Sequence, residues 1–294
     1  MNFLSGFTAI IGPPNVGKST LLNRILRTKV SIVSAKPQTT RNRILGIYNG
    51  RGYQIVFMDT PGIHKTITDL HKSMVQSATA AFQEVDSLLL VIEMGKPNDP
   101  EIPSIVKGLK AIRKPCILAI NKIDKGPKEQ LLKIIDDFSR IHDFEAIMPV
   151  SALNGDGIDT LIEELRSRLH EGPQFFPADM KTDKPESFIV SEIIREKIYL
   201  YLKKELPYSS AVTVEKIEEV PEKEMLFISG VIHVETDSQK GILIGSKGRM
   251  IKDIGHSARL DLEKKFGVKV YLDLVVKVDK NWSRDPKALR RLGY

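Results

Sequence analysis

Residues 12–19 read GPPNVGKS, and this stretch decides the fold of the first half of the chain. It matches the pattern G-x-x-x-x-G-K-[ST] in full, after the apolar run TAIIG and before the helical pattern KSTLLNRIL. The glycines allow the backbone to wrap around a phosphate with its N–H groups, and the following helix adds the positive end of its dipole. The stretch therefore predicts a phosphate-binding loop between a buried strand and a helix.

The sequence around this loop alternates between strand-like and helical patterns. The apolar runs FTAIIG, YQIVFMDT, SLLLVIEM, CILAIN and AIMPVS indicate buried strands. Helical periodicity occurs near residues 17–27, 67–83, 99–112, 128–140 and 157–169. Such alternation is typical of an α/β fold with a mostly parallel sheet covered on both faces. The turn signal NGRG interrupts ILGIYNGRGYQIVFMD, which predicts one antiparallel edge strand before it.

Two further motifs follow predicted strands. Asp59 begins DTPG, where its carboxylate can hold a magnesium ion and the backbone N–H of Gly62 can reach a γ-phosphate. NKID, residues 121–124, follows the run CILAI. Asp124 can accept two hydrogen bonds from guanine, which carries N1–H and N2–H₂ side by side, whereas adenine offers no such donor pair. The stem of Lys122 can cover the face of the base. These motifs predict a guanine nucleotide.

Ser151 and Ala152 follow the strand-like run AIMPV and can present a backbone N–H to O6 of guanine. With this fourth motif, the set resembles the P-loop GTPases of the translation-factor class. Lys18 is expected to reach the β- and γ-phosphates, and the hydroxyl of Ser19 to bind Mg²⁺. The resemblance assigns Thr40, in the segment SAKPQTTR, as a Mg²⁺ ligand that engages only when a γ-phosphate is present.

One position departs from the Ras-like pattern. Ile63 stands where Ras-like enzymes carry a water-orienting glutamine, so slow basal hydrolysis is expected. Related GTPases use an asparagine at the position of Asn15 to help hold K⁺, which makes K⁺ an additional predicted ion. The residues predicted to act in catalysis are Asn15, Lys18, Thr40 and Gly62. The predicted Mg²⁺ ligands are Ser19, Thr40 and Asp59. The residues predicted to bind GTP or GDP are Gly12, Pro13, Pro14, Asn15, Val16, Gly17, Lys18, Ser19, Thr20, Asp59, Thr60, Pro61, Gly62, Asn121, Lys122, Asp124, Ser151 and Ala152.

The last part of the chain has a different order of patterns. A helix, SFIVSEIIREKIYLYLKKEL, precedes the strands AVTVEKIEEV and EMLFISGVIHVE; the helices QKGILIG and GRMIKDIGHSARLDLEKKFG and the strand VKVYLDLVVKVD follow. This α-β-β-α-α-β order is that of a type II KH domain, in which a GxxG loop clamps a nucleic-acid backbone. A plain connection between two helices is the alternative reading of this loop. The residues predicted to bind RNA are Ile244, Gly245, Ser246, Lys247, Gly248, Arg249, Lys252 and Arg259.

GTPase motifs followed by such a KH domain resemble the bacterial Era GTPases over nearly the whole chain. The matching segments are GPPNVGKSTLLN, SAKPQTTRNRI, DTPGIHK, NKID, VSA and GSKG. The resemblance implies a GTP-hydrolysing switch that binds small-subunit ribosomal RNA near its 3′ end and acts in assembly of the small ribosomal subunit. It also implies a cytoplasmic protein with peripheral contact to the anionic inner membrane. We expect a monomer.

Length and charge agree with two domains. The 294 residues divide into a predicted GTPase domain at 1–172, a proline-containing linker at 173–186 and a KH-type domain at 187–294. The net charge is +7, but residues 179–239 hold 8 basic and 13 acidic side chains, whereas residues 240–294 hold 14 and 6. A basic C-terminal region favours a polyanionic partner. The single cysteine, Cys116, lies in an apolar run and is expected in the core, which excludes a disulfide scaffold.

Two other functions fit parts of the sequence. A metabolic enzyme such as a kinase would share the phosphate-binding loop, but NKID and the basic GxxG loop argue against it. A regulator at the membrane surface would use residues 240–294 to bind anionic lipid. No apolar run approaches the ~20 residues of a membrane span, and no signal peptide is expected.

Overall fold

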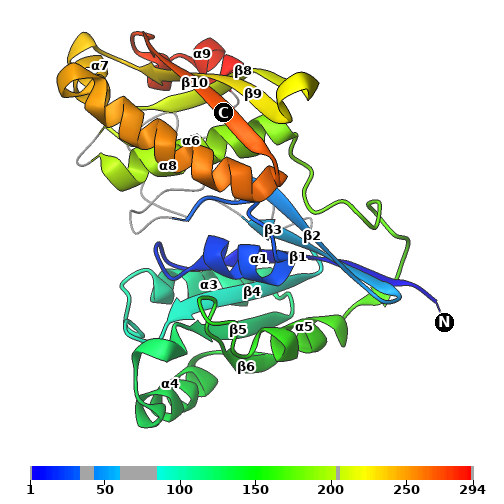
Figure 1. The fold of residues 1–294 in the computed structure, drawn as a ribbon. Helices are drawn as coiled ribbons and strands as arrows, with labels where there is room; N and C mark the ends of the chain where they lie inside the picture. The colour runs from blue at the N-terminus through cyan, green and yellow to red at the C-terminus, as the bar shows by residue number, and fades with distance from the viewer. Residues whose placement is uncertain (1, 34–42, 60–84, 203–205, 293–294) are drawn as a thin grey trace. The chain divides into compact units, whose positions relative to one another are not determined.

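The computed structural model describes residues 2–33, 43–59, 85–202 and 206–292 (Figure 1). These residues separate into two compact units, one ending at Asp183 and one beginning at Lys184. The predicted site residues Thr40, Thr60, Pro61 and Gly62 and the helix predicted near 67–83 lie outside the described residues.

A seven-stranded sheet forms the first unit. Its order is β2-β3-β1-β4-β5-β6, and a short strand, β7, pairs with β1. The strands are β1 (Leu4–Ile11), β2 (Ile44–Gly50), β3 (Tyr53–Asp59), β4 (Ser87–Glu93), β5 (Cys116–Asn121), β6 (Ala146–Pro149) and β7 (His170–Glu171). The pairs β3–β1, β1–β4, β4–β5 and β5–β6 are parallel, whereas β2 runs antiparallel to β3. The predicted α/β class and the antiparallel edge strand are both confirmed.

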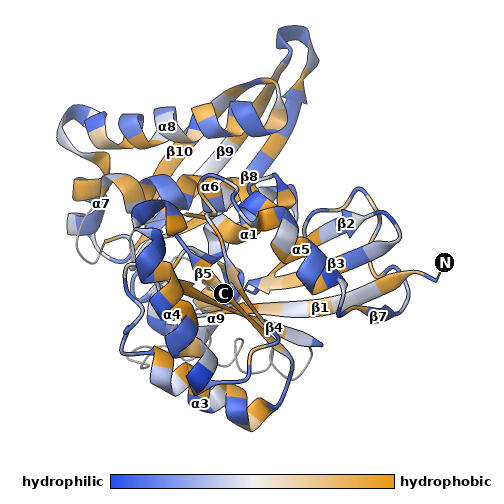
Figure 2. Ribbon diagram, turned by 90° about the horizontal axis from the view of Figure 1, so that it is seen from below, coloured by the Kyte–Doolittle hydropathy of each residue, from blue (hydrophilic) through white to orange (hydrophobic). Residues whose placement is uncertain are grey.

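Helices cover both faces of this sheet. They are α1 (Lys18–Leu26), α3 (Ile102–Ile112), α4 (Lys128–Ile141) and α5 (Ile158–Arg166), and a short 3₁₀ helix, η1 (Ile123–Lys125), follows β5. Along β4, Leu88 and Leu90 pack in one buried cluster with α3 and α4, and Leu89 packs in the other with α1 and α5. Because successive strand side chains point to opposite faces, a strand buried on both sides is an unbroken apolar run. Figure 2 shows this as hydrophobic central strands beneath helices of mixed hydropathy.

Cys116 belongs to this core, as its sequence context predicted. Its side chain is 1% exposed. Burial raises the pKa of the thiol to about 12, so it stays protonated at neutral pH and is a poor nucleophile.

The proline-containing segment after α5 is held on the first unit. Gln54 of β3 is fully buried, and its side-chain Oε1 accepts from the backbone N–H groups of Phe175 (3.0 Å) and Phe176 (3.1 Å). Further along, the backbone N–H of Leu45 in β2 donates to Oδ1 of Asp183 (3.0 Å). The rings of Phe7 and Phe175 lie 4.9 Å apart between centroids. The segment is thus docked along the sheet up to Asp183.

The second unit is an α+β fold. Its elements are α6 (Glu186–Tyr201), β8 (Ala211–Val220), β9 (Met225–Val234), α7 (Asp237–Ile244), α8 (Arg249–Phe266), β10 (Lys269–Val278) and α9 (Pro286–Arg291), with 3₁₀ helices η2 (Pro221–Lys223), η3 (Ser246–Gly248) and η4 (Trp282–Arg284). The sheet order is β10-β9-β8, in which β8 and β9 are antiparallel and β9 and β10 parallel. Side chains from α6, α7, α8 and the three strands share one buried cluster. The predicted α-β-β-α-α-β order is confirmed.

Helix α9 was not anticipated from the sequence. Asp285 caps it by accepting from the backbone N–H of Lys287 (2.9 Å), and Pro286 occupies its first turn. Trp282, just before it, is fully buried and donates from Nε1 to the carbonyl of Ser209 (3.1 Å). The Asp-Pro pair is a recognisable helix start, but six residues carry too little periodicity to indicate a helix.

Candidate functional site

The phosphate-binding loop lies between β1 and α1, as predicted. Two of its glycines are required by geometry. Gly12 has φ +141°, and a Cβ there would lie 2.1 Å from the carbonyl oxygen of Val91. Gly17 has φ +100°, and a Cβ there would lie 2.4 Å from Nδ2 of Asn121. Only glycine allows β4 and β5 to approach the loop this closely.

Lys18 begins α1 and folds back over the loop. Its Nζ donates to the carbonyls of Gly12 (2.8 Å) and Pro13 (2.7 Å). Burial lowers the pKa of Lys18 to about 8, although the nearby carboxylate of Asp59 acts in the opposite direction. In this structure the Lys18 ammonium donates to two neutral carbonyl oxygens. A phosphate oxygen is charged and would accept a stronger hydrogen bond from it than either carbonyl does.

Two predicted magnesium ligands are brought together across the sheet edge. Ser19, in the first turn of α1, donates from Oγ to Oδ2 of Asp59 at the end of β3 (3.0 Å). Asp59 is fully buried, and its Oδ2 also accepts from Oγ of Ser31 (3.0 Å). A hydroxyl and a carboxylate are hard oxygen ligands of the kind Mg²⁺ prefers. Ser31 was missed in the sequence because nothing local distinguishes it from other loop serines.

Asn121 joins three of the predicted motifs. It ends β5 and is 1% exposed. Its Nδ2 donates to the carbonyl of Val16 in the phosphate-binding loop (2.8 Å), and its Oδ1 accepts from the backbone N–H of Ala152 (3.0 Å). One side chain therefore ties the phosphate end of the site to the two turns predicted to recognise the base.

Lys122 and Asp124 are positioned by neighbours on other elements. Lys122 donates from Nζ to the carbonyl of Asn15 (2.7 Å) and pairs with Glu93 at the end of β4 (2.6 Å). Asp124 is exposed and accepts at Oδ1 from the hydroxyl of Ser151 (2.6 Å). This hydroxyl fixes one carboxylate oxygen of Asp124, so the group is oriented before any base arrives.

A side chain of α1 hydrogen-bonds to the turn after β6. Arg24 donates from Nε to the carbonyl of Ala152 (3.0 Å) and from its guanidinium to that of Leu153. The backbone N–H of Ser151 donates to the carbonyl of Asp156 (2.9 Å). Both N–H groups of the Ser151–Ala152 pair thus already have protein acceptors, so O6 of guanine would have to share the Ala152 donor with Asn121. Glu93 and Arg24 were missed because each acts on a motif far away in sequence.

Pro14, Asn15 and Thr20 also lie where the pattern put them. Pro14 and Asn15 are in the loop, and Thr20 is in the first turn of α1. Asn15 is exposed with φ 62°, a left-handed conformation that asparagine tolerates better than most residues. The part of the chain that the structure describes contains no cluster of three or more His, Cys, Asp or Glu side chains suited to hold a metal.

The second unit carries the predicted RNA-binding loop. Ile244 ends α7, the turn Gly245–Gly248 follows, and Arg249 begins α8. A Cβ on Gly245 (φ +71°) would lie 2.7 Å from Cβ of Met250, so the close turn needs glycine there.

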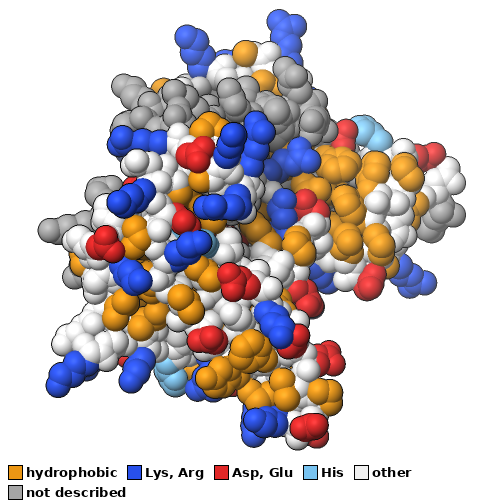
Figure 3. All heavy atoms as spheres, turned by 90° about the horizontal axis from the view of Figure 1, so that it is seen from above, with side chains coloured by type: hydrophobic (Ala, Val, Ile, Leu, Met, Phe, Trp, Pro, Cys, Tyr) orange, Lys and Arg blue, Asp and Glu red, His pale blue; other side chains and the backbone are white. Residues whose placement is uncertain are grey.

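The residues predicted to bind RNA differ in exposure and in whether they already form an ion pair. Ser246, Lys247, Arg249 and Lys252 are exposed. Arg259, two turns further along α8, pairs with Glu263 (2.8 Å). The N-terminus of α8 adds backbone N–H groups and a positive dipole end beside these cations. Figure 3 shows basic, acidic and hydrophobic side chains intermixed on one face of the molecule.

Comparison with known families divides the chain in two. Residues 7–122 match the family described as 50S ribosome-binding GTPase, and residues 205–283 match the KH domain family.

The relatives found by sequence cover the whole chain. It is 51% identical over 292 residues to the GTPase Era of Syntrophus aciditrophicus, a match that covers 99% of this chain and 95% of that protein. It is 48% identical over 292 residues to the GTPase Era of Geobacter metallireducens, covering 99% of this chain and 98% of that one.

Two solved structures are also similar over both units. A crystal structure of a variant of Aquifex aeolicus Era bound to GDP and AlF₄⁻ has a TM-score of 0.94 at 42% identity and covers 99% of both chains. A crystal structure of Era with MgGDPNP and nucleotides 1506–1542 of 16S ribosomal RNA has a TM-score of 0.93 at 42% identity, again with 99% of both chains covered.

Proposed function

This chain belongs to the Era family of GTPases, and from that premise we propose that it is a GTP-driven switch that binds small-subunit ribosomal RNA and acts in assembly of the small ribosomal subunit. As a member of this family it hydrolyses GTP to GDP and phosphate. The single observation that carries this assignment is the double bonding of Asn121, which joins the phosphate-binding loop at the Val16 carbonyl to the predicted base-recognition turn at the Ala152 N–H. The KH fold with its exposed GxxG loop supports the RNA partner.

The residues at the sheet edge fit GTP with Mg²⁺. Gly12 and Gly17 allow the loop to turn where a Cβ would clash with Val91 and Asn121, and Lys18 supplies positive charge beside the loop. The Ser19 hydroxyl and the Asp59 carboxylate would hold Mg²⁺, which when bound neutralises charge on the phosphates. Asp124 and Lys122 would orient the base. The proposed roles of Thr40 and Gly62 concern residues outside the described part of the chain.

We expect Lys18 to report phosphate binding through its pKa. Burial holds this pKa near 8 in the nucleotide-free protein, and a bound phosphate favours the charged form, so GDP should raise it. A titration of ¹³C-labelled lysine side chains by NMR, with Lys18 assigned from Lys18→Arg, should give a midpoint near pH 8 without nucleotide. With GDP bound, Lys18 should remain charged through pH 9. An unchanged midpoint would mean that Lys18 does not contact the phosphates.

K⁺ is expected to stimulate hydrolysis relative to Na⁺. Ile63 cannot orient water, so charge near the β–γ bridge has to come from elsewhere, as the arginine finger of other GTPases supplies it. Asn15 is exposed in the loop and available for such an ion. Steady-state rates should be several-fold higher in KCl than in NaCl, and Asn15→Ala should weaken the difference. Asn15→Gly, which keeps the left-handed backbone at no steric cost, separates loss of the side chain from strain. Equal rates of the wild type in both salts would contradict the prediction.

The switch itself is tested by crosslinking. The full chain, loaded with either GDPNP or GDP, is crosslinked to total RNA and the bound fragments are sequenced. Fragments from the 3′ end of the small-subunit ribosomal RNA should be enriched, and more strongly with GDPNP. Fragments spread evenly over all RNA, or identical in the two nucleotide states, would contradict an RNA-binding switch.

The remaining parts of the proposal rest on the family resemblance. We propose the boundaries 1–172, 173–186 and 187–294 for the GTPase domain, linker and KH domain, a monomeric state and a cytoplasmic location. Peripheral contact with an anionic membrane remains a prediction, which competition between RNA and acidic vesicles would test. Within the ranges described by the structure, no helix is both long and apolar enough to cross a bilayer.

A further inference from the structure

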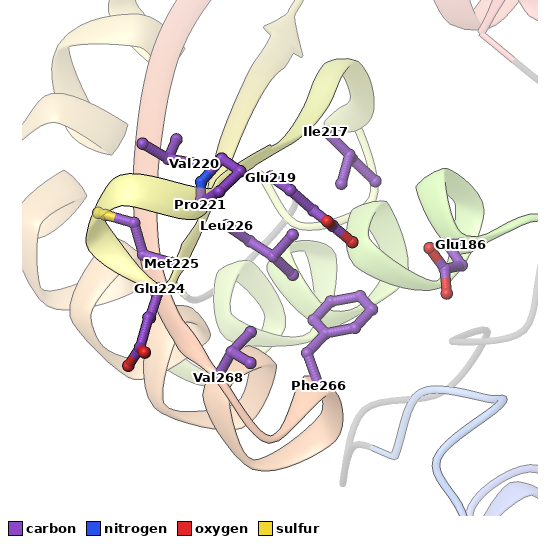
Figure 4. Close-up of a pocket in the computed structure, with 10 residues that line it drawn as sticks. All are labelled: Glu186, Ile217, Glu219, Val220, Pro221, Glu224, Met225, Leu226, Phe266 and Val268. Atoms are coloured by element: carbon purple, nitrogen blue, oxygen red, sulfur yellow. The ribbon is translucent and has the colours of Figure 1, made fainter.

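A pocket of about 500 Å³ lies in the second unit, away from the GxxG loop in sequence. Its walls come from the β8–β9 hairpin, the first turn of α6, the end of α8 and the residue before β10. Figure 4 shows the side chains of Leu226 and Phe266 facing one another across it. Neither the nucleotide site nor the predicted RNA-binding residues contribute to its lining.

The floor of the pocket is apolar and partly open to water. Ile217 and Leu226, from neighbouring strands, and Phe266, from the last turn of α8, are each half-buried, and Val268 is 41% exposed. Ile217, Leu226 and Phe266 pack against the buried cluster of the unit and extend it to the surface. Removing apolar surface from water is favourable, so an apolar side chain of a partner would be stabilised here.

The rim is acidic. Glu186, Glu219 and Glu224 line the pocket, and no lysine or arginine does. Among the residues that the structure describes, none of the three forms an ion pair. Lys216, on the same strand as Glu219, pairs instead with Glu218 (2.8 Å). Lys265 lies near Glu186. Burial lowers the pKa of Lys265, and its attraction to the Glu186 carboxylate raises this pKa again only in part.

Charge and shape together restrict the occupant. Residues 179–239 hold 13 acidic and 8 basic side chains, against 6 acidic and 14 basic in residues 240–294. Carboxylates around an apolar floor repel a nucleic-acid backbone and attract cations, and one of the three, Glu186, already has a neighbouring cation, Lys265. The basic helix α9 of a second copy of the chain is a poor occupant of this pocket. Its apolar side chains Ala288 and Leu289 are already buried in their own unit and are not available to fill the apolar floor.

We propose that this pocket is a docking site for a basic segment of a partner protein. The segment would place one or two apolar side chains between Leu226 and Phe266 and Lys or Arg side chains against Glu186, Glu219 and Glu224. The proposal goes beyond the nucleotide and RNA sites and depends on neither.

The test is a selection from a random 12-residue peptide library displayed on phage, using the full GDP-bound chain. Selected peptides should combine Lys or Arg with Leu, Ile, Met or an aromatic residue. A synthetic copy of the best peptide is then titrated by fluorescence anisotropy against the wild type, Glu219→Gln/Glu224→Gln and Glu215→Gln/Glu222→Gln. The two double variants remove the same charge from the same region, but only the first pair lines the pocket.

The first double variant should lower peptide affinity about tenfold, since exposed ion pairs contribute up to about fivefold each. The control pair should lower it less than twofold. Val268→Ser should weaken binding through the apolar floor without a change of charge. Selected peptides without basic residues, or equal losses in the two double variants, would overturn the proposal. Concentration-dependent self-association of the chain that Glu219→Gln/Glu224→Gln abolishes would assign the pocket to a second copy and equally overturn it.

Discussion

Asp124→Asn is expected to turn the chain from a guanine-binding into a xanthine-binding protein. The carboxylate of Asp124 would accept from N1–H and N2–H₂ of guanine, and a hydrogen bond to a charged group contributes about 1.5–3 kcal/mol. Losing both predicts a fall in GDP affinity of about 10²–10⁴-fold. Xanthine carries a carbonyl at C2, to which the asparagine amide can donate, so XDP affinity should rise.

The measurement compares the Kd of GDP, XDP and ADP for the wild type and the variant. Asp156→Asn is a matched control, because Asp156 is an exposed aspartate in the same turn as Ser151. The control should keep its preference for GDP. Comparable affinity of the wild type for ADP and GDP would contradict this assignment of Asp124. So would a variant whose affinity for GDP falls while its affinity for XDP does not rise.

Ser246→Asp with Lys247→Asp should abolish most RNA binding while leaving the nucleotide site intact. Both side chains are exposed in the turn between α7 and α8, so the stability of the fold should change by no more than about 0.5 kcal/mol each. Loss of one charge-assisted phosphate contact and the added repulsion predict a fall in RNA affinity of about 10–100-fold. The slope of log affinity against log salt should flatten by roughly 0.7 for each lost contact on single-stranded RNA.

RNA binding across a salt series and GTP binding are measured on the same preparation. Ser238→Asp with Lys223→Asp makes the same change of charge at two other exposed positions of the second unit. Unaltered RNA affinity in the folded loop variant would show that Gly245–Gly248 only connects two helices. A parallel loss of GTP binding would show instead that the two units do not bind their ligands independently.

The nucleotide motifs could be predicted from sequence because each is a short local pattern with its own chemistry. Gly12 and Gly17 provide backbone shapes that only glycine adopts, and NKID places a carboxylate directly after a strand. The carboxyl ends of parallel strands meet at one edge of a sheet. Strand order along the chain was therefore sufficient to predict that these motifs form one site. The order α-β-β-α-α-β identified the second unit in the same way.

The tertiary structure decided what holds those motifs in position. Lys122 pairs with Glu93 of β4, and Arg24 of α1 supports the turn of Ala152; these partners are 29 and 128 residues apart. Such contacts leave no local trace, because any exposed charge has many possible partners until the chain is folded. The same holds for Gln54, whose buried amide fixes Phe175 and Phe176 more than 120 residues later. The prolines of that segment predicted a linker, but not the strand against which it lies. The sequence alone thus determined which chemistry is present, through local backbone and strand-end patterns. Only the packing of distant segments decided how rigidly each group is held, because the geometry of those contacts depends on the whole fold.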